Sequence, residues 1–112
     1  MTFYKYIHSG DYENLKKIID RHPQKTHKLT RALICAVEND RDNIIELLMN
    51  KNINFHYNNY EILRICIKKN RLELINNILS RIDNIADLKI NADLQLYEPV
   101  ISMMIEKGWS YN

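Results

Sequence analysis

The sequence predicts an all-α fold of stacked helix-turn-helix repeats, and three observations support this. A pattern of apolar and charged residues recurs every 30 positions. Within each recurrence the apolar residues have the spacing of an amphipathic helix. Glycine and proline number only two each, too few for the many turns of a β-sandwich. A chain of 112 residues has the length of one domain, so we expect a single repeat domain over 1–112.

The recurrence is clearest in the second helix of each repeat. Three segments start at residues 10, 40 and 70, and four of their positions agree in character: Leu15/Ile45/Ile75, Ile18/Leu48/Ile78, Ile19/Met49/Leu79 and Arg21/Lys51/Arg81. The apolar positions are spaced i, i+3 and i+4, which places them on one helical face. Acidic residues near each start and basic residues near each end suit the helix dipole. Pro23 predicts that the first of these helices ends near His22.

A more apolar helix is expected before each of these segments. Residues 32–37 and 62–67 are apolar nearly all round and lie 30 apart, so each should pack between two neighbours. Residues 3–9 hold the same place at the start of the chain. The repeats therefore span approximately 1–25, 26–56, 57–84 and 85–112, about three and a half helical pairs.

The last repeat is the least regular. Residues 103–108 predict the end of a helix with Gly108 just after it, and Pro99 suits its first turn. Residues 88–96 alternate apolar and polar side chains, a period typical of a strand. The repeat spacing predicts a first helix there instead. We expect a degenerate helix, with the extended form of 86–96 as the alternative.

The first helices and the turns after them carry a motif. Leu33 and Leu63 are followed three residues later by the small side chains of Ala36 and Cys66. The first and second helix of each repeat are joined through a residue that can adopt a left-handed turn: Gly10, Asp40 or Asn70. With these features the unit resembles the ankyrin repeat, whose first helix opens on T-P-L-H-x-A. Segment 52–64 is similar to a 30-residue variant common in ankyrin proteins of giant DNA viruses.

The resemblance implies an α-solenoid with a concave face that binds another protein. Because the unit is shorter than the family's period of about 33 residues, its β-hairpin fingers should be short or absent. Heavy use of Ile, Asn, Lys and Tyr, whose codons are AT-rich, suggests a large DNA virus, a phage or a low-GC bacterium. The function expected is therefore a non-catalytic interaction module and, if the source is viral, an adaptor or inhibitor of a host protein.

Family contact positions can be transferred to this chain. They are the two residues before each turn and the finger positions, which here are His8, Ser9, His27, Lys28, Thr30, Glu38, Asn39, Tyr57, Asn58, Tyr60, Lys68 and Lys69. Tyr57 and Tyr60 are the best hot-spot candidates, because tyrosine offers a large area and a polar group. The alternatives are that both tyrosines pack over a loop and that Lys68 and Lys69 are an ordinary solvated helix end.

Two other functions remain open. The ends of a short stack are apolar, with Tyr4 and Tyr6 at one end and Met103, Met104 and Trp109 at the other, so the chain could form a homodimer. A small nucleic-acid binder is less favoured, because the net charge is only +2 and basic residues alternate with acidic ones.

Catalysis, metal binding and cofactors are not expected. The four histidines are scattered, and His22 and His27 lack a nearby cysteine pair of the kind a zinc site uses. Cys35 and Cys66 lie in apolar helical patterns and are expected to be core thiols, with no Cys–His neighbourhood evident. There is no glycine-rich phosphate loop. Without an apolar run of about 18 residues or a signal peptide, we expect the protein inside a cell, in the cytoplasm.

Overall fold

The computed structural model describes residues 2–110, and these contain seven helices and no strand. The predicted all-α fold is therefore confirmed. The chain divides into two compact units, Met1–Asn54 (unit 1) and Phe55–Asn112 (unit 2), which are described separately below. None of the helices in the described part has the length and apolar character that a bilayer-spanning helix needs.

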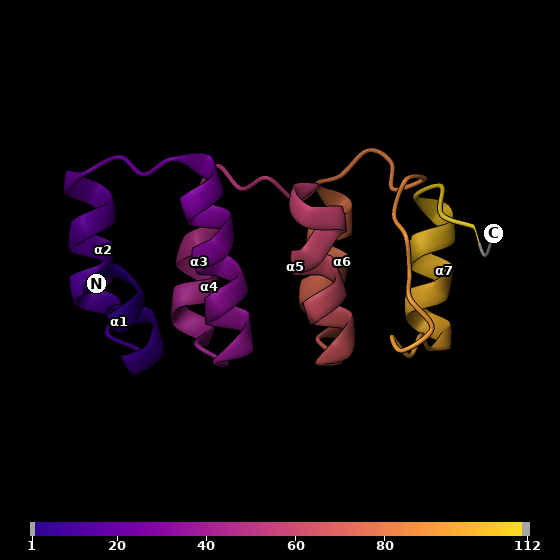
Figure 1. Ribbon diagram of the computed structural model, residues 1–112, viewed down its shortest axis with the longest axis horizontal. Helices are drawn as coiled ribbons and strands as arrows, with labels where there is room; N and C mark the ends of the chain where they lie inside the picture. The colour runs from indigo at the N-terminus through magenta and orange to yellow at the C-terminus, as the bar shows by residue number, and fades with distance from the viewer. Residues whose placement is uncertain (1, 111–112) are drawn as a thin grey trace. The chain divides into compact units, whose positions relative to one another are not determined.

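Unit 1 consists of two helical hairpins (Figure 1). The first pairs α1 (Thr2–Ser9) with α2 (Tyr12–Arg21), and the second pairs α3 (Thr26–Glu38) with α4 (Asp42–Met49). Helix α1 packs on α3, and α2 packs on α4. First helix therefore lies on first helix and second on second, which is the arrangement expected for neighbouring repeats.

The interior of unit 1 is formed by the apolar residues that define the recurrence. Leu15, Leu33 and Leu48 are fully buried. Thr30 is buried as well, and its hydroxyl donates to the Thr26 carbonyl at 2.9 Å and accepts from the Asn54 N–H at 2.9 Å. A buried polar group is stable only when it is hydrogen-bonded, and both bonds of Thr30 satisfy that condition.

Unit 2 contains one hairpin and one further helix. Helices α5 (Tyr57–Lys68) and α6 (Leu72–Ser80) form the hairpin, and α7 (Glu98–Glu106) packs on α6. Residues 81–97 have no helix or strand. The expected degenerate helix over 88–96 is therefore wrong, and the segment is an irregular loop.

The reason lies in where the apolar side chains of this loop fall. Ile82, Ile85 and Leu88 are buried, but beyond Leu88 the loop has no further fully buried residue before Val100. A helix over 88–96 would divide its apolar side chains between two opposite faces, Leu88 with Leu96 and Ile90 with Leu94, so one of the two sets would stay exposed. The Asn84 side chain also accepts from the Ala86 N–H at 2.7 Å, a local turn that competes with helix formation.

The same left-handed turn ends the first helix of each hairpin. Gly10, Asp40 and Asn70 have φ values of 75°, 55° and 58°. In each turn the next N–H donates back five residues, to Tyr6, Ala36 and Cys66 respectively, at 2.8–2.9 Å. This is the Schellman arrangement, in which a residue with positive φ allows the last carbonyls of a helix to be paired. The predicted left-handed turns are confirmed.

The fourth such turn ends α7. Gly108 has a φ of 94°, and the Trp109 N–H donates to the Met104 carbonyl at 3.1 Å. Trp109 is buried, so it folds back against the end of the helix. The turn lies 38 residues after Asn70 instead of 30, and the loop of residues 81–97 lies within that interval.

Candidate functional site

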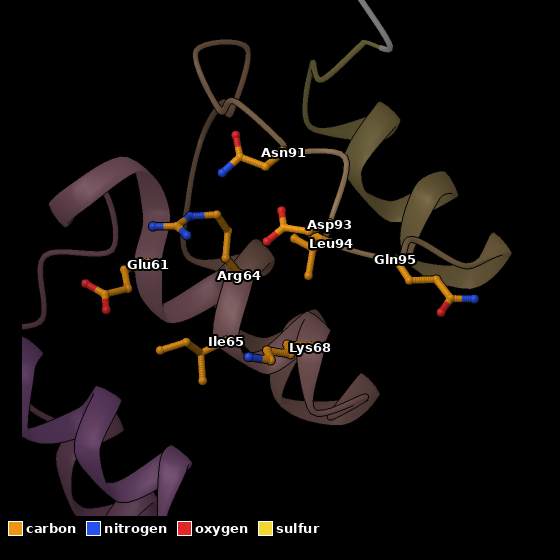
Figure 2. Close-up of a pocket in the computed structure, with 8 residues that line it drawn as sticks. All are labelled: Glu61, Arg64, Ile65, Lys68, Asn91, Asp93, Leu94 and Gln95. Atoms are coloured by element: carbon orange, nitrogen blue, oxygen red, sulfur yellow. The ribbon is translucent and has the colours of Figure 1, made fainter.

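The site with the best-defined geometry is a groove of about 470 Å³ in unit 2, which we call the α5 groove (Figure 2). One wall is the helix α5 and the other is the irregular loop, and eight side chains line it: Glu61, Arg64, Ile65, Lys68, Asn91, Asp93, Leu94 and Gln95. The helix residues are spaced i, i+3, i+4 and i+7, so they form one face of α5. The volume is within the range of about 300–1,000 Å³ that is usual for small-molecule sites.

The loop wall is fixed to the start of α5 by side-chain hydrogen bonds. The Asn59 amide group pairs with the backbone of Lys89 in both directions, donating to its carbonyl at 2.8 Å and accepting from its N–H at 3.0 Å. The Tyr60 hydroxyl lies 3.3 Å from the Asn84 carbonyl and donates to the Asp87 carboxylate. Two neighbouring side chains therefore position residues 84–89, and through them the loop wall of the α5 groove.

These two side chains extend from an unusual backbone. Asn58, Asn59 and Tyr60 have φ values of 53°, 54° and 56°, a single left-handed turn at the start of α5. Each L-residue in this conformation costs about 1–2 kcal/mol, and for a bulky tyrosine it is an outlier. Strain of this kind clusters at functional sites, where the surrounding structure holds it in place.

Arg64 stabilises the left-handed turn from inside the α5 groove. Its Nε donates to the Asn59 carbonyl and its Nη2 to the Asn58 carbonyl, both at 2.8 Å. The Asn58 amide in turn donates to the Glu61 carboxylate at 2.7 Å. Two charged residues of the helix wall, Arg64 and Glu61, therefore already contact the turn.

Asp93 and Lys68 have no such contacts. Neither side chain has a hydrogen-bond or ion-pair partner within residues 2–110, and both are exposed. The lining holds two carboxylates and two basic groups, so its formal charge is 2 − 2 = 0. The α5 groove is thus neutral overall but has one unpaired charge of each sign.

The bond between Tyr60 and Asp87 changes the acidity of both groups. Burial, followed by the hydrogen bond to Asp87, raises the pKa of Tyr60 to about 12. The same hydrogen bond lowers the pKa of the Asp87 carboxyl. Around neutral pH the bond therefore joins a protonated phenol to an ionised carboxylate, which is the stronger type of hydrogen bond.

A second cluster lies in unit 1 at the ends of the first helices. The Cys35 Sγ lies 3.7 Å from the His8 Nε2, and the Asn39 amide donates to the Cys35 carbonyl at 2.8 Å and lies 3.6 Å from its Sγ. The sequence showed no such Cys–His neighbourhood, because 27 residues separate the two side chains. Burial and then the charge of Glu38 raise the pKa of Cys35, so the sulfur is held as a thiol, the weakly nucleophilic form.

Most of the predicted contact residues lie on the surface, but two do not. Tyr60 is 2% exposed and Thr30 is fully buried, so the expectation that they present side chains to a partner is wrong. Both residues form internal hydrogen bonds instead. The others are exposed or partly exposed: His8, Ser9, His27, Lys28, Glu38, Asn39, Tyr57, Asn58, Lys68 and Lys69.

The predicted finger positions lie at the starts of two first helices. His27, Lys28 and Thr30 belong to the first turns of α3, and Tyr57, Asn58 and Tyr60 to the start of α5. The Lys28 ammonium lies 4.6 Å from the centre of the Phe3 ring, a cation–π contact that holds part of this side chain on α1. The structure brings His8 and Asn39 together around Cys35, and it brings Lys68 into the α5 groove.

Sequence reasoning missed most of the α5 groove, including all four loop residues from Asn91 to Gln95. The available signal was the alternation of apolar and polar residues over 88–96, which indicates that the segment is not helical. Within residues 2–110, no group of three or more His, Cys, Asp or Glu side chains could hold a metal ion.

Comparison with known proteins adds no relative. No protein-family model matches the chain, and neither a curated protein nor a solved structure matches it.

Proposed function

We propose that the chain is an ankyrin-like, non-catalytic module that binds another protein through the exposed side of its first helices. One observation supports this proposal: residues at the same position of the three hairpins are of the same type in the interior but differ in charge and size on the surface. The residues before the turn are His8 and Ser9 in the first hairpin, Glu38 and Asn39 in the second, and Lys68 and Lys69 in the third. The turns after them have the same φ sign and hydrogen bonds.

Such a surface suits recognition for a physical reason. The hairpin backbone is fixed by buried residues such as Leu33 and Leu63, so surface side chains can differ in charge without altering the fold. A preorganised surface also loses little conformational entropy when it binds a partner. The free thiols of Cys35 and Cys66 support the proposal that the module works inside a cell, where a cytoplasmic partner would be met. The resemblance to a viral repeat variant supports a host protein as that partner.

The test is affinity capture with matched variants. The immobilised chain is exposed to an extract of the cells in which it naturally occurs, and the retained proteins are identified by mass spectrometry. We expect one captured protein to be lost with His8→Ala or Lys68→Ala, both exposed on first helices. Lys17→Ala and Glu73→Ala, which change exposed residues of second helices, should retain it.

Two results would overturn the proposal in different ways. Retention of no protein above an unrelated helical control of the same size would contradict the binding function itself. Equal capture by all four variants, with unchanged helical circular dichroism, would place the binding surface elsewhere.

Self-association is a second candidate function, favoured by the surface of α7. Ile105 is 50% exposed there, unusual for a large apolar side chain, and Met103 is partly exposed. Light scattering at two concentrations tests this directly. A mass that doubles with concentration and returns to the monomer value in Ile105→Glu would support a dimer, and a constant monomer mass would exclude it.

A further inference from the structure

The α5 groove combines opposite charges with apolar surface, as a binding site for a peptide does. Its two unpaired charges, Asp93 on the loop wall and Lys68 on the helix wall, can attract a basic and an acidic side chain respectively. Ile65 and Leu94 supply apolar surface, one on each wall. Figure 2 shows these four side chains around the same hollow.

The amide side chains of the loop wall suit a polypeptide backbone. Asn91 and Gln95 each carry donors and an acceptor, so they can pair with both the N–H and the C=O groups of an extended segment. The loop backbone next to them is also open. Gln95 and Leu96 donate their N–H to no protein group within the described residues, so both N–H groups are available to a peptide carbonyl.

The length of the helix wall sets the size of the occupant. Glu61 and Lys68 are seven residues apart, about 10 Å along a helix at 1.5 Å per residue. An extended chain rises about 3.3 Å per residue, so roughly three residues cover this distance. A nucleic acid fits less well, since phosphates require a net positive surface and this lining is neutral.

We propose that the α5 groove binds a short extended peptide in which a basic residue faces Asp93 and an acidic residue faces Lys68. The proposal rests on the proposed function, since it assigns the kind of partner that this module recognises. The left-handed turn at Asn58–Tyr60 has a defined role in it: the turn positions the loop wall before the peptide arrives.

The experiment is a selection from a library of octapeptides with acetylated and amidated ends, using the immobilised full chain. The expected result is enrichment of one basic and one acidic position at a fixed spacing. Charge reversal should then change the selection: Asp93→Lys should replace the basic preference by an acidic one, and Lys68→Glu should do the opposite. The peptide selected by the original chain should bind each variant at least about tenfold more weakly, because like charges would face each other.

Asp83→Lys is the matched control. Asp83 is an exposed carboxylate of the same loop that does not line the α5 groove, so its reversal should leave the selection unchanged. Circular dichroism of all variants separates loss of binding from loss of fold.

Three results would overturn the proposal. If peptides are selected but the preference is the same in Asp93→Lys and Lys68→Glu, the peptide binds elsewhere. If no peptide is selected while a folded protein is still captured, the partner is not an extended segment, and the proposed function stands without this inference. If single-stranded oligonucleotides bind more tightly than any selected peptide, the α5 groove belongs to a different class of site.

Discussion

Units 1 and 2 begin with the same helical hairpin and differ in the segment that comes after it. In unit 1 the opening first helix, α1, is covered by the next first helix, α3, which packs on it. In unit 2 the corresponding place after α5 is taken by an irregular loop with only three buried side chains, Ile82, Ile85 and Leu88. The comparison shows that a loop buries one end of a first helix and leaves its middle open as a groove.

The turns show that this difference does not arise from the hairpins themselves. Asp40 and Asn70 have nearly the same φ, and the same hydrogen bonds form after them in each unit. The two units differ in how the covering segment is held. In unit 1 the covering helix α3 contributes the buried Leu29 and Leu33, whereas in unit 2 Asn59 and Tyr60 bind the loop through polar groups. Polar contacts fix position but bury little apolar area, and so they leave room for a ligand.

The largest expected effect tests whether the two hairpins have equivalent interiors. Leu33 and Leu63 are 30 residues apart and both fully buried. Leu33→Ala and Leu63→Ala should each lower the free energy of unfolding by about 2–5 kcal/mol, because each leaves a cavity. Urea unfolding followed by circular dichroism measures this. A loss below about 1 kcal/mol at either position would mean that its leucine is not part of a packed core.

The second effect compares the glycines that end α1 and α7. Both have positive φ, so alanine at either position costs about 1–2 kcal/mol. An added Cβ at Gly10 would meet only the flexible Arg41 side chain at 3.4 Å, but at Gly108 it would lie 2.7 Å from Asn84 Nδ2. Displacing Asn84 breaks its bond to the Ala86 N–H, so Gly108→Ala should cost about 1 kcal/mol more than Gly10→Ala. Equal losses in thermal unfolding would contradict the packing of Asn84 against this turn.

The third effect concerns the Tyr60 hydroxyl. Tyr60→Phe keeps the buried ring and removes the bond to Asp87, which should lower stability by about 1 kcal/mol. Tyr57→Phe is the control, since the Tyr57 hydroxyl forms no hydrogen bond to any residue that the structure describes. Equal stability of the two variants would show that the hydroxyl bond contributes nothing.

The same bond predicts how stability depends on pH. The Tyr60 pKa is raised to about 12 in the folded chain, so its contribution is complete below the ordinary tyrosine pKa of about 10 and is lost as the pH rises toward 12. The Asp87 pKa is lowered on folding, so its contribution is complete above the ordinary aspartate pKa of about 3.9 and is lost at lower pH. Tyr60→Phe should flatten both slopes, and unchanged slopes would contradict the coupling.

The smallest effect comes from Asn59→Gly. Glycine adopts a positive φ without strain, so the backbone gain offsets part of the loss of the two bonds to Lys89. The net loss of stability should be about 0.5 kcal/mol, while amide exchange at Lys89 should accelerate strongly. Asn76→Gly, at an exposed position of α6, should cost about 0.3 kcal/mol through helix propensity and leave Lys89 unchanged. Slow exchange at Lys89 in Asn59→Gly would show that other contacts hold the loop.

The sequence predicted features that depend on neighbouring residues better than features that depend on contacts between distant segments. The second helices and their turns were predictable, because Leu15, Ile45 and Ile75 repeat a local pattern whose physical cause lies within one helix turn. The contact between His8 and Cys35 was not, since it depends on how α1 and α3 pack together. Tyr60 was predicted as an exposed hot spot because tyrosine suits both surfaces and interiors. The burial of Tyr60 results from a left-handed turn that no local sequence pattern predicts.

The loop of residues 81–97 was the failure that mattered most for function. The 30-residue spacing favoured a helix there, whereas the alternating pattern of 88–96 opposed it, and the pattern was the better guide. Periodicity predicts where a helix belongs, but a helix forms only if its own side chains supply a face to bury. The loop residues of the α5 groove could therefore not be located from the repeat alone.

Amide hydrogen exchange over residues 86–97, measured by NMR, tests most directly that a loop replaces the missing first helix. The Lys89 N–H should exchange slowly, because it donates to Asn59 Oδ1 at 3.0 Å. The N–H groups of Asp93, Gln95 and Leu96 should exchange nearly as fast as in an unfolded chain, since none has a protein acceptor within the described residues. A continuous run of protected amides from 88 to 96 would instead show a helix, and with it a closed surface where we place the α5 groove.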